Sequence, residues 1–177
     1  MTSDSTQRFS DRVEAYLAGR PRYPAELVSH LGTLGALPHA GIVADIGVGT
    51  GLSAEPFLAA GHRVGLYTSP HLVSFTERIR INNIPVTEDR VIDLAERVRT
   101  RYEGLPSAEG GALTPPFFEV TTAMAFTCFA EERVDVAVVE AGMGGRLDST
   151  NVIAPMVSVI TNSDVEHAEF LGDTIEK

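Results

Sequence analysis

The sequence predicts an α/β domain with three layers, in which helices cover both faces of a mainly parallel open sheet. Short apolar runs typical of buried strands alternate with longer segments of helical periodicity, as in βαβ units. Glycine-rich turns follow two of these runs. The chain has 177 residues, of which 44% are hydrophobic and 21% are charged, and this composition suits a single domain with a buried core.

Four apolar runs predict the strands of the sheet. Val, Ile and Ala predominate in three of them, and the fourth, at 61–67, enters its apolar part through Gly-His-Arg. The predicted strands cover residues 42–47, 61–67, 134–139 and 157–161. The segment 75–86 alternates apolar and polar residues, and it predicts either a small hairpin or a loop.

The predicted helices lie between these strands. Thr87 is a good helix cap, so an amphipathic helix is expected to follow it as far as about residue 101. A loop rich in Gly, Pro and Ser covers 104–116, and a buried helix is expected at 117–131. Two further helices are predicted, at 9–31 with a break at the prolines of 20–24, and at 53–60.

The charge balance excludes several classes of partner. The net charge is −10, so the surface would repel a phosphate backbone and we expect no nucleic-acid partner. Arginines between 78 and 101 are interleaved with acidic residues, which favours a solvated helix face. Backbone N–H groups can still hold a small anionic ligand.

Cysteine and hydropathy indicate a cytoplasmic protein without a membrane partner. Cys128 is the single cysteine, which excludes an internal disulfide and a cysteine-based zinc cluster. The first residues do not resemble a signal peptide, and no apolar run is long enough to span a membrane. Thirteen of the fourteen basic residues are arginine, and the one lysine is Lys177, so a mechanism that needs an internal lysine is excluded.

Residues 65–177 carry several motifs in a characteristic order. They are Tyr67-Thr-Ser-Pro-His-Leu72, Glu77-Arg-Ile-Arg-Ile81, Phe117-Phe-Glu-Val-Thr121, Glu140-Ala-Gly-Met-Gly-Gly-Arg-Leu-Asp148 and His167-Ala-Glu-Phe-Leu-Gly172. This segment resembles a truncated central domain of folylpolyglutamate synthase/dihydrofolate synthase, a branch of the Mur ligase family. The resemblance implies an ATP-dependent ligase that converts a carboxylate of folate or dihydropteroate to an acyl phosphate, which the amino group of glutamate then attacks.

The same resemblance assigns candidate site residues. Glu140 and His167 would bind Mg²⁺ beside the ATP phosphates, although a capping glutamate and a surface histidine are the structural alternative. Ser69, Pro70 and His71 lie in a segment similar to the loop that covers the pterin substrate. Phe118 resembles a contact with that substrate, and it is equally what the start of a buried helix would show.

Residues 9–64 resemble the start of a class I S-adenosylmethionine-dependent methyltransferase instead. The residues that carry this likeness are Arg20-Pro-Arg-Tyr-Pro24 and Asp45-Ile-Gly-Val-Gly-Thr-Gly51. The turn is the candidate cofactor site under either resemblance, through Asp45, Gly47, Gly49, Thr50, Gly51 and Ser53. We therefore expect one chimeric α/β domain, with methyltransferase-like helices and a first βα unit in 1–64 and a partial ATP-binding domain in 65–177.

The expected function is that of an impaired ligase. A phosphate loop of this family has Gly-Lys-Gly-Ser/Thr, whereas Leu52 stands between Gly51 and Ser53 here, and the charge of the lysine is missing. The alternatives are a methyltransferase fragment that binds S-adenosylmethionine and an inactive α/β scaffold. Because the resemblance ends just after the last predicted strand, we also expect uncovered sheet surface that favours self-association.

Overall fold

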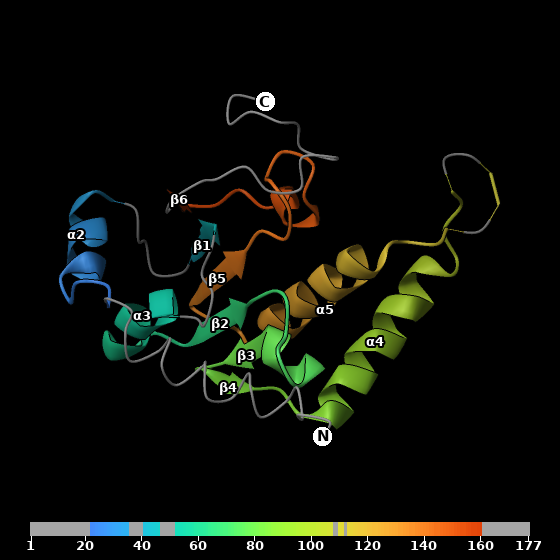
Figure 1. Ribbon diagram of the computed structural model, residues 1–177, viewed down its shortest axis with the longest axis horizontal. Helices are drawn as coiled ribbons and strands as arrows, with labels where there is room; N and C mark the ends of the chain where they lie inside the picture. The colour runs from blue at the N-terminus through green and yellow to red at the C-terminus, as the bar shows by residue number, and fades with distance from the viewer. Residues whose placement is uncertain (1–21, 36–40, 47–51, 108–109, 112, 161–177) are drawn as a thin grey trace, which may run out of the picture.

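A computed structural model describes residues 22–35, 41–46, 52–107, 110–111 and 113–160 of the chain (Figure 1). The helices are α2 (Leu27–Thr33), α3 (Glu55–Ala59), α4 (Glu88–Tyr102) and α5 (Phe117–Glu131), with short 3-10 turns η1 (Leu52–Ala54), η2 (Phe75–Arg78) and η3 (Ser149–Val152). The strands are β1 (Gly41–Ile46), β2 (Val64–Tyr67), β3 (Ile79–Ile81), β4 (Ile84–Pro85), β5 (Val136–Glu140) and β6 (Val157–Ile160).

The strands form one sheet in the order β4-β3-β2-β5-β1-β6. Strands β2, β5, β1 and β6 are parallel, and only β3 and β4 run antiparallel to their neighbours in this sheet of described residues. The predicted fold class is therefore confirmed, and the segment 75–86 forms a hairpin after one 3-10 turn. Because four strands run in the same direction, their carboxyl ends share one edge of the sheet.

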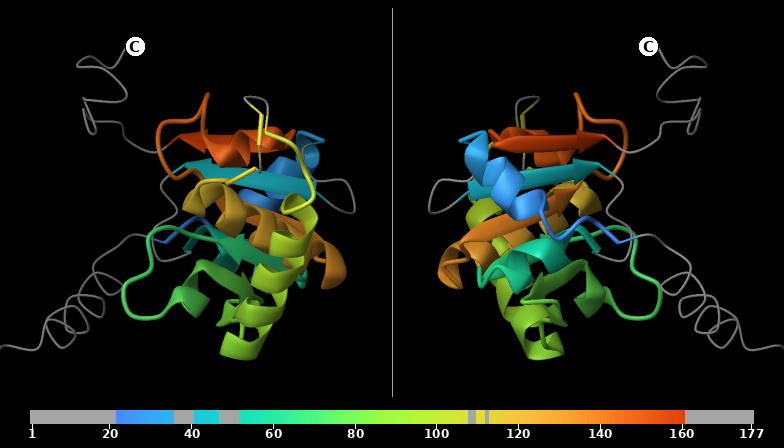
Figure 2. Two further views of the ribbon diagram at one scale, coloured as in Figure 1. Left: turned by 90° about the vertical axis from the view of Figure 1, so that its right-hand side faces the viewer. Right: turned by 90° about the vertical axis from the view of Figure 1, so that its left-hand side faces the viewer.

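Helices cover both faces of the sheet, with α2 and α3 on one side and α4 and α5 on the other (Figures 1 and 2). Strand β5 contributes to both cores because its side chains alternate between the faces. Val136 and Val138 pack in a cluster with Phe57 of α3, whereas Ala137 and Val139 pack with residues of α4 and α5. All five residues of β5 are buried, so this strand is the centre of the molecule.

Helices α4 and α5 match the prediction, whereas the helix predicted at 53–60 is divided into η1 and α3. Of the helix predicted at 9–31, residues 9–21 lie outside the described residues, and the rest is helical only from Leu27, in α2. Thr87 precedes α4, and its hydroxyl accepts a hydrogen bond from the Arg90 N–H at 3.2 Å. Helix α5 covers the predicted residues 117–131. Strand β2 starts later than predicted because Gly61, at φ 87°, ends α3 and leaves the next two residues in the connection to the strand.

Strand β6 pairs only with β1 among the described residues, so it forms an edge of the sheet. Near it, the side chains of Leu147, Val152 and Ile160 are 92%, 78% and 72% exposed. These residues show exposed apolar side chains near this edge, whereas the uncovered sheet surface and self-association through it both stay predictions. In the described part of the chain, no helix has both the length and the apolar composition of a membrane span.

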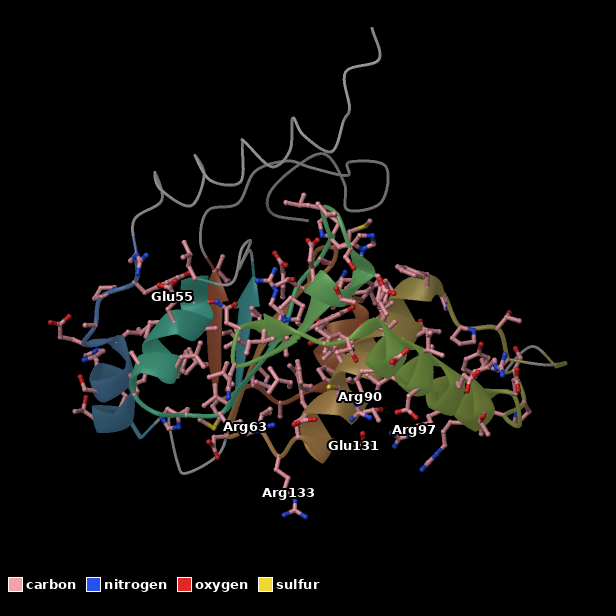
Figure 3. All side chains as sticks on the ribbon, turned by 90° about the horizontal axis from the view of Figure 1, so that it is seen from below. Glu55, Arg63, Arg90, Arg97, Glu131 and Arg133 are labelled. Carbon is pink, nitrogen blue, oxygen red and sulfur yellow. The ribbon has the colours of Figure 1, made fainter. Side chains whose placement is uncertain are left out.

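An ion-pair cluster joins α4 to the end of α5. Glu131 binds Arg90 and Arg97, and Asp93 lies within reach of both arginines. Figure 3 shows this cluster along the same side as Arg63 and Arg133, which precede β2 and β5. The cluster therefore lies toward the edge where the parallel strands begin, opposite the edge where they end.

We expect Gly65→Ala to destabilise the fold. A Cβ at Gly65 would lie 2.6 Å from the Phe129 ring, so β2 and α5 would have to separate. Overpacking of this kind lowers the free energy of unfolding by about 1–3 kcal/mol, which urea denaturation would measure. Gly32→Ala is the matched control, because a Cβ there meets nothing within 4 Å in α2. Equal unfolding free energies for the two variants would contradict this packing.

Glu131 should make stability depend on pH in the acid range. Hydrogen bonds from Arg97 and then Arg90 lower the pKa of Glu131 to about 2 from 4.5. A lowered pKa in the folded state means that the contribution is complete above about pH 4.5 and is lost as the pH falls toward 2. Urea midpoints between pH 2 and 6 should therefore fall less steeply for Glu131→Gln than for the unsubstituted chain. Parallel pH profiles would contradict the assignment.

Candidate functional site at the carboxyl ends of the parallel strands

The carboxyl ends of β1, β2 and β5 bring three segments with candidate residues to one edge of the sheet. In the strand register Asp45 pairs with Glu140, and Tyr67 pairs with Val139. The candidate residues of 68–74 and 141–148 therefore start from adjacent strand ends. The glycine turn after β1, with Gly47, Gly49, Thr50 and Gly51, lies outside the described residues, as does His167.

Glu140 connects two of these segments. Glu140 is the last residue of β5 and is largely buried, with 7% of the residue exposed. The Ser69 backbone N–H donates a hydrogen bond to its Oε2 atom at 2.8 Å. The predicted metal ligand and the predicted substrate loop thus meet directly. Pro70 follows in the same loop, after a cis peptide bond.

Residues 68–74 are organised by a second carboxylate, that of Glu77. It accepts hydrogen bonds from the N–H groups of Leu72, Val73 and Ser74 at 3.0, 3.0 and 2.7 Å. Partial burial raises the pKa of Glu77, but these three backbone donors outweigh burial and hold the pKa below its usual value. The loop is therefore held in one conformation by a charged acceptor.

His71 faces Arg78 rather than open solvent. The Arg78 Nε–H donates to His71 Nδ1 at 2.8 Å, and the Arg78 guanidinium carbon lies 5.9 Å from the centre of the Phe75 ring. It also lies 5.5 Å from the centre of the Phe117 ring. His71 thus has Nδ1 engaged within the protein, which leaves Nε2 for any ligand.

The segment 141–148 is held by Asp148. Its Oδ2 atom accepts hydrogen bonds from the N–H groups of Gly142 and Met143 at 2.9 and 2.8 Å. Its Oδ1 atom accepts from the Thr150 N–H at 2.9 Å and from the Thr150 hydroxyl. One carboxylate therefore fixes both the start of the glycine loop and the η3 turn that follows it.

Phe118 lies against this loop. A Cβ at Gly142 would be 2.4 Å from the Phe118 ring, so only glycine allows the observed approach. The ring also packs on Tyr67, with centroids 5.9 Å apart. Phe118 is half-buried, so it has a packing role at this edge, and its predicted substrate contact stays a prediction.

Ser53 is the first described candidate after the glycine turn. It is 5% exposed, and its hydroxyl is the one buried side-chain oxygen or nitrogen without a hydrogen-bond partner in the described part of the chain. A buried hydroxyl without a partner costs free energy unless another group satisfies it. Ser53 lies in η1, just before α3, and its hydroxyl could accept a partner from a bound molecule.

The donor set at this edge fits Mg²⁺. Within the described ranges no three His, Cys, Asp or Glu side chains gather, so a cage made entirely of protein ligands is not found there. Mg²⁺ does not need one, because it commonly binds one or two carboxylates and completes its shell with phosphates and water. Glu140 has a carboxylate of this kind and Ser53 has a hydroxyl, and binding of Mg²⁺ by either residue stays a prediction.

Two residues of the edge do not appear among the sequence candidates. Asp148 closes an Asp-Ser-Thr turn, a pattern in which the aspartate accepts hydrogen bonds from residues ahead of it. Arg78 gives no signal in the sequence, because its Glu-Arg-Ile-Arg surroundings resemble an exposed strand. Its burial depends on Phe117, which is 39 positions away along the chain.

We expect Asp148→Asn to loosen the glycine loop. The substitution places an NH₂ group or a weaker acceptor against the N–H groups of Gly142 and Met143. Amide hydrogen exchange at these two residues should accelerate by about tenfold, since a hydrogen bond to a charged group contributes roughly 1.5–3 kcal/mol. Glu103→Gln, in an exposed pair with Arg99, is the control. Unchanged exchange at both amides would contradict the assignment.

Curated relatives match about two thirds of the chain, although no protein-family model matches it. The dihydrofolate synthase/folylpolyglutamate synthase of Bacillus subtilis is 43% identical over 119 residues, which are 67% of this chain and 27% of that protein. The mitochondrial folylpolyglutamate synthase of Homo sapiens is 41% identical over 119 residues, or 66% of this chain and 20% of that protein. The chain therefore spans about a quarter of the length of these relatives.

Solved structures match more of the chain. E. coli FolC in complex with ADP aligns with a TM-score of 0.66 and 31% identity, covering 94% of this chain and 40% of that one. A complex of FPGS with AMPPCP and folate aligns with a TM-score of 0.63 and 32% identity, covering 93% and 43%.

A match over 94% of the chain reaches well into residues 1–64, so the ligase fold also accommodates this segment. None of the relatives or structures named above is a methyltransferase, and nothing in the comparisons supports the predicted chimera or the S-adenosylmethionine site. Over about two thirds of its length, the chain is a homologue of the folylpolyglutamate and dihydrofolate synthases, and it shares the fold of the corresponding part of those enzymes.

Proposed function

We propose that this chain forms the nucleotide-phosphate and folate side of an ATP-dependent carboxylate–amine ligase of the folylpolyglutamate/dihydrofolate synthase type. The observation that carries the proposal is the hydrogen bond from the Ser69 N–H to Glu140. It joins the candidate substrate loop to the candidate metal ligand, in a chain 43% identical over 119 residues to such an enzyme.

The proposed roles follow from position. The turn 47–51 and Ser53 of η1 would face the ATP phosphates, since the backbone N–H groups of a glycine-rich turn can hold an anion. Glu140 would hold Mg²⁺, with His167 as a further proposed ligand, and the metal would neutralise phosphate charge. Asp45 is a further candidate for this site, because its backbone lies opposite Glu140 in the register.

The proposed substrate is a folate-type carboxylate, with glutamate as the amine. FPGS has been solved with AMPPCP and folate, and E. coli FolC with DHPP and ADP. Ser69, Pro70 and His71 would cover the pterin, and Phe118 would pack against it. The aromatic surface beside a fixed polar loop suits a flat heterocycle that ends in a carboxylate.

The missing lysine is expected to affect the rate of ligation more than the binding of Mg²⁺-ATP. In phosphate loops the lysine stabilises charge on the transferred phosphoryl group, and arginine is the only internal basic residue type in this chain. We therefore expect this chain to bind Mg²⁺-ATP while ligation stays slow, because removal of one electrostatic stabiliser typically costs about 10²–10³-fold in rate.

A thermal melt with and without Mg²⁺-ATP tests the proposal. A ligand that binds only the folded state stabilises it by roughly 2.7 kcal/mol at a hundredfold excess over Kd. Mg²⁺-ATP should raise the melting midpoint, and Glu140→Ala should abolish the shift. Glu131→Gln is the control, because its carboxylate lies toward the opposite edge of the sheet (Figure 3). Its own midpoint is expected to fall, and its shift with Mg²⁺-ATP should persist.

The contradicting outcomes are equally specific. A midpoint that Mg²⁺-ATP does not move, in a chain that melts cooperatively, would mean that no nucleotide site operates here. A shift that survives Glu140→Ala would place the nucleotide elsewhere. A shift with S-adenosylhomocysteine alone, lost on Asp45→Ala, would favour the methyltransferase alternative.

A further inference from the structure

Arg78 is a buried cation without a carboxylate partner in the described part of the chain. It is 7% exposed, and every ion pair found among the described residues involves other arginines. Removal of a guanidinium from water costs solvation free energy that paired charges normally compensate. The buried charge therefore requires compensation from another source.

The contacts present use only part of its bonding capacity. A guanidinium has five N–H donors, and the Nε–H of Arg78 donates to His71 Nδ1 at 2.8 Å. The rings of Phe75 and Phe117 compensate the charge in part through cation–π contacts. The four N–H groups on the two terminal nitrogens have no acceptor among the described residues.

These terminal nitrogens are also accessible. The one fully enclosed side-chain polar atom without a partner in the described ranges is Ser53 Oγ, so both terminal nitrogens of Arg78 keep contact with solvent. The side chain is thus buried along its length and open at its end. That arrangement suits an anion that arrives from outside and accepts two parallel hydrogen bonds.

Arg78 lies at the same edge as the proposed site. Its backbone carbonyl accepts the Thr68 N–H at 3.0 Å, and the next residue, Ser69, donates to Glu140. On the other side it contacts Phe117, whose neighbour Phe118 packs against the Gly142 loop. Arg78 therefore lies between the two segments that would enclose a substrate.

We propose that Arg78 binds a carboxylate of the folate-type ligand, and that His71 is the positioning residue that aims it. This inference rests on the proposed function and adds the recognition of the carboxylate to it. Nδ1 of His71 accepts the hydrogen bond from the Arg78 Nε–H and so fixes the direction of the guanidinium. The two aromatic rings then hold the guanidinium plane while its terminal nitrogens receive the ligand.

The test measures binding of two ligands by calorimetry: folate, and folate diamide, in which carboxamides replace both glutamate carboxylates. The unsubstituted chain should bind folate about 10- to 100-fold more tightly than the diamide, as expected for charge-assisted hydrogen bonds. In Arg78→Gln this preference should disappear, with similar affinity for the diamide. Arg80→Gln, two positions further along the chain and within β3, is the matched control and should keep the preference.

His71 variants test the positioning role. His71→Asn keeps an acceptor near the place of Nδ1 and should retain most of the preference for folate, whereas His71→Leu should lose it. A purely structural role would lower the affinity for both ligands together in both variants.

Several results would overturn the proposal. They are equal affinity of the unsubstituted chain for folate and the diamide, absence of folate binding, and a preference that survives in Arg78→Gln. If Arg78→Gln does not fold, His71→Leu decides the matter, because a preference for folate that survives in this variant would also overturn the proposal. The melting shift with Mg²⁺-ATP is measured separately, so a failed test of carboxylate binding does not contradict the proposed nucleotide site. Loss of that melting shift in a folded Arg78→Gln variant would indicate that the arginine binds phosphate instead.

Discussion

The pairing of β5 with both β1 and β2 is the constraint on which the rest of the structure depends. All five residues of β5 are buried, and the strand supplies alternate side chains to the cores on the two faces. Its carboxyl end places Glu140 beside the ends of both neighbouring strands. The position of the candidate site is therefore fixed by the same hydrogen-bonded ladder that holds the sheet together.

Carboxylates that accept backbone N–H groups give this edge its shape. Glu140 holds the start of one loop, Glu77 holds the rest of that loop, and Asp148 holds the glycine loop. Glu77 and Asp148 each accept from three backbone N–H groups and Glu140 accepts from that of Ser69, so the edge is preorganised before a ligand arrives. A net charge of −10 is compatible with binding of anions here, because fixed dipoles and a local cation decide the field at short range.

The sequence predicts most of the architecture because hydrophobic periodicity and helix capping are local properties of the chain. Thr87 predicts the start of α4, and the apolar run before Glu140 predicts a buried strand. That strand starts two residues later than predicted, because Val134 and Asp135 belong to the turn that Arg133 makes at φ 49°. The role of Arg78 could not be predicted, because its burial depends on tertiary contact with Phe117. The likeness of residues 9–64 to a methyltransferase finds no support in the comparisons, and it is a weak guide because a strand, a glycine turn and a helix occur in both folds.

The most direct test of a nucleotide-phosphate site at this edge is paramagnetic broadening of backbone amide signals by Mn²⁺-ATP in the nitrogen-15-labelled chain. Mn²⁺ takes the same oxygen ligands as Mg²⁺ and broadens nearby signals. If Mn²⁺-ATP binds at the strand ends, we expect selective loss of the signals of Ser69, Glu140 and Ala141, while those of Arg97 and Glu131 stay sharp. Broadening centred on Arg97 and Glu131, or none at the strand ends, would contradict it.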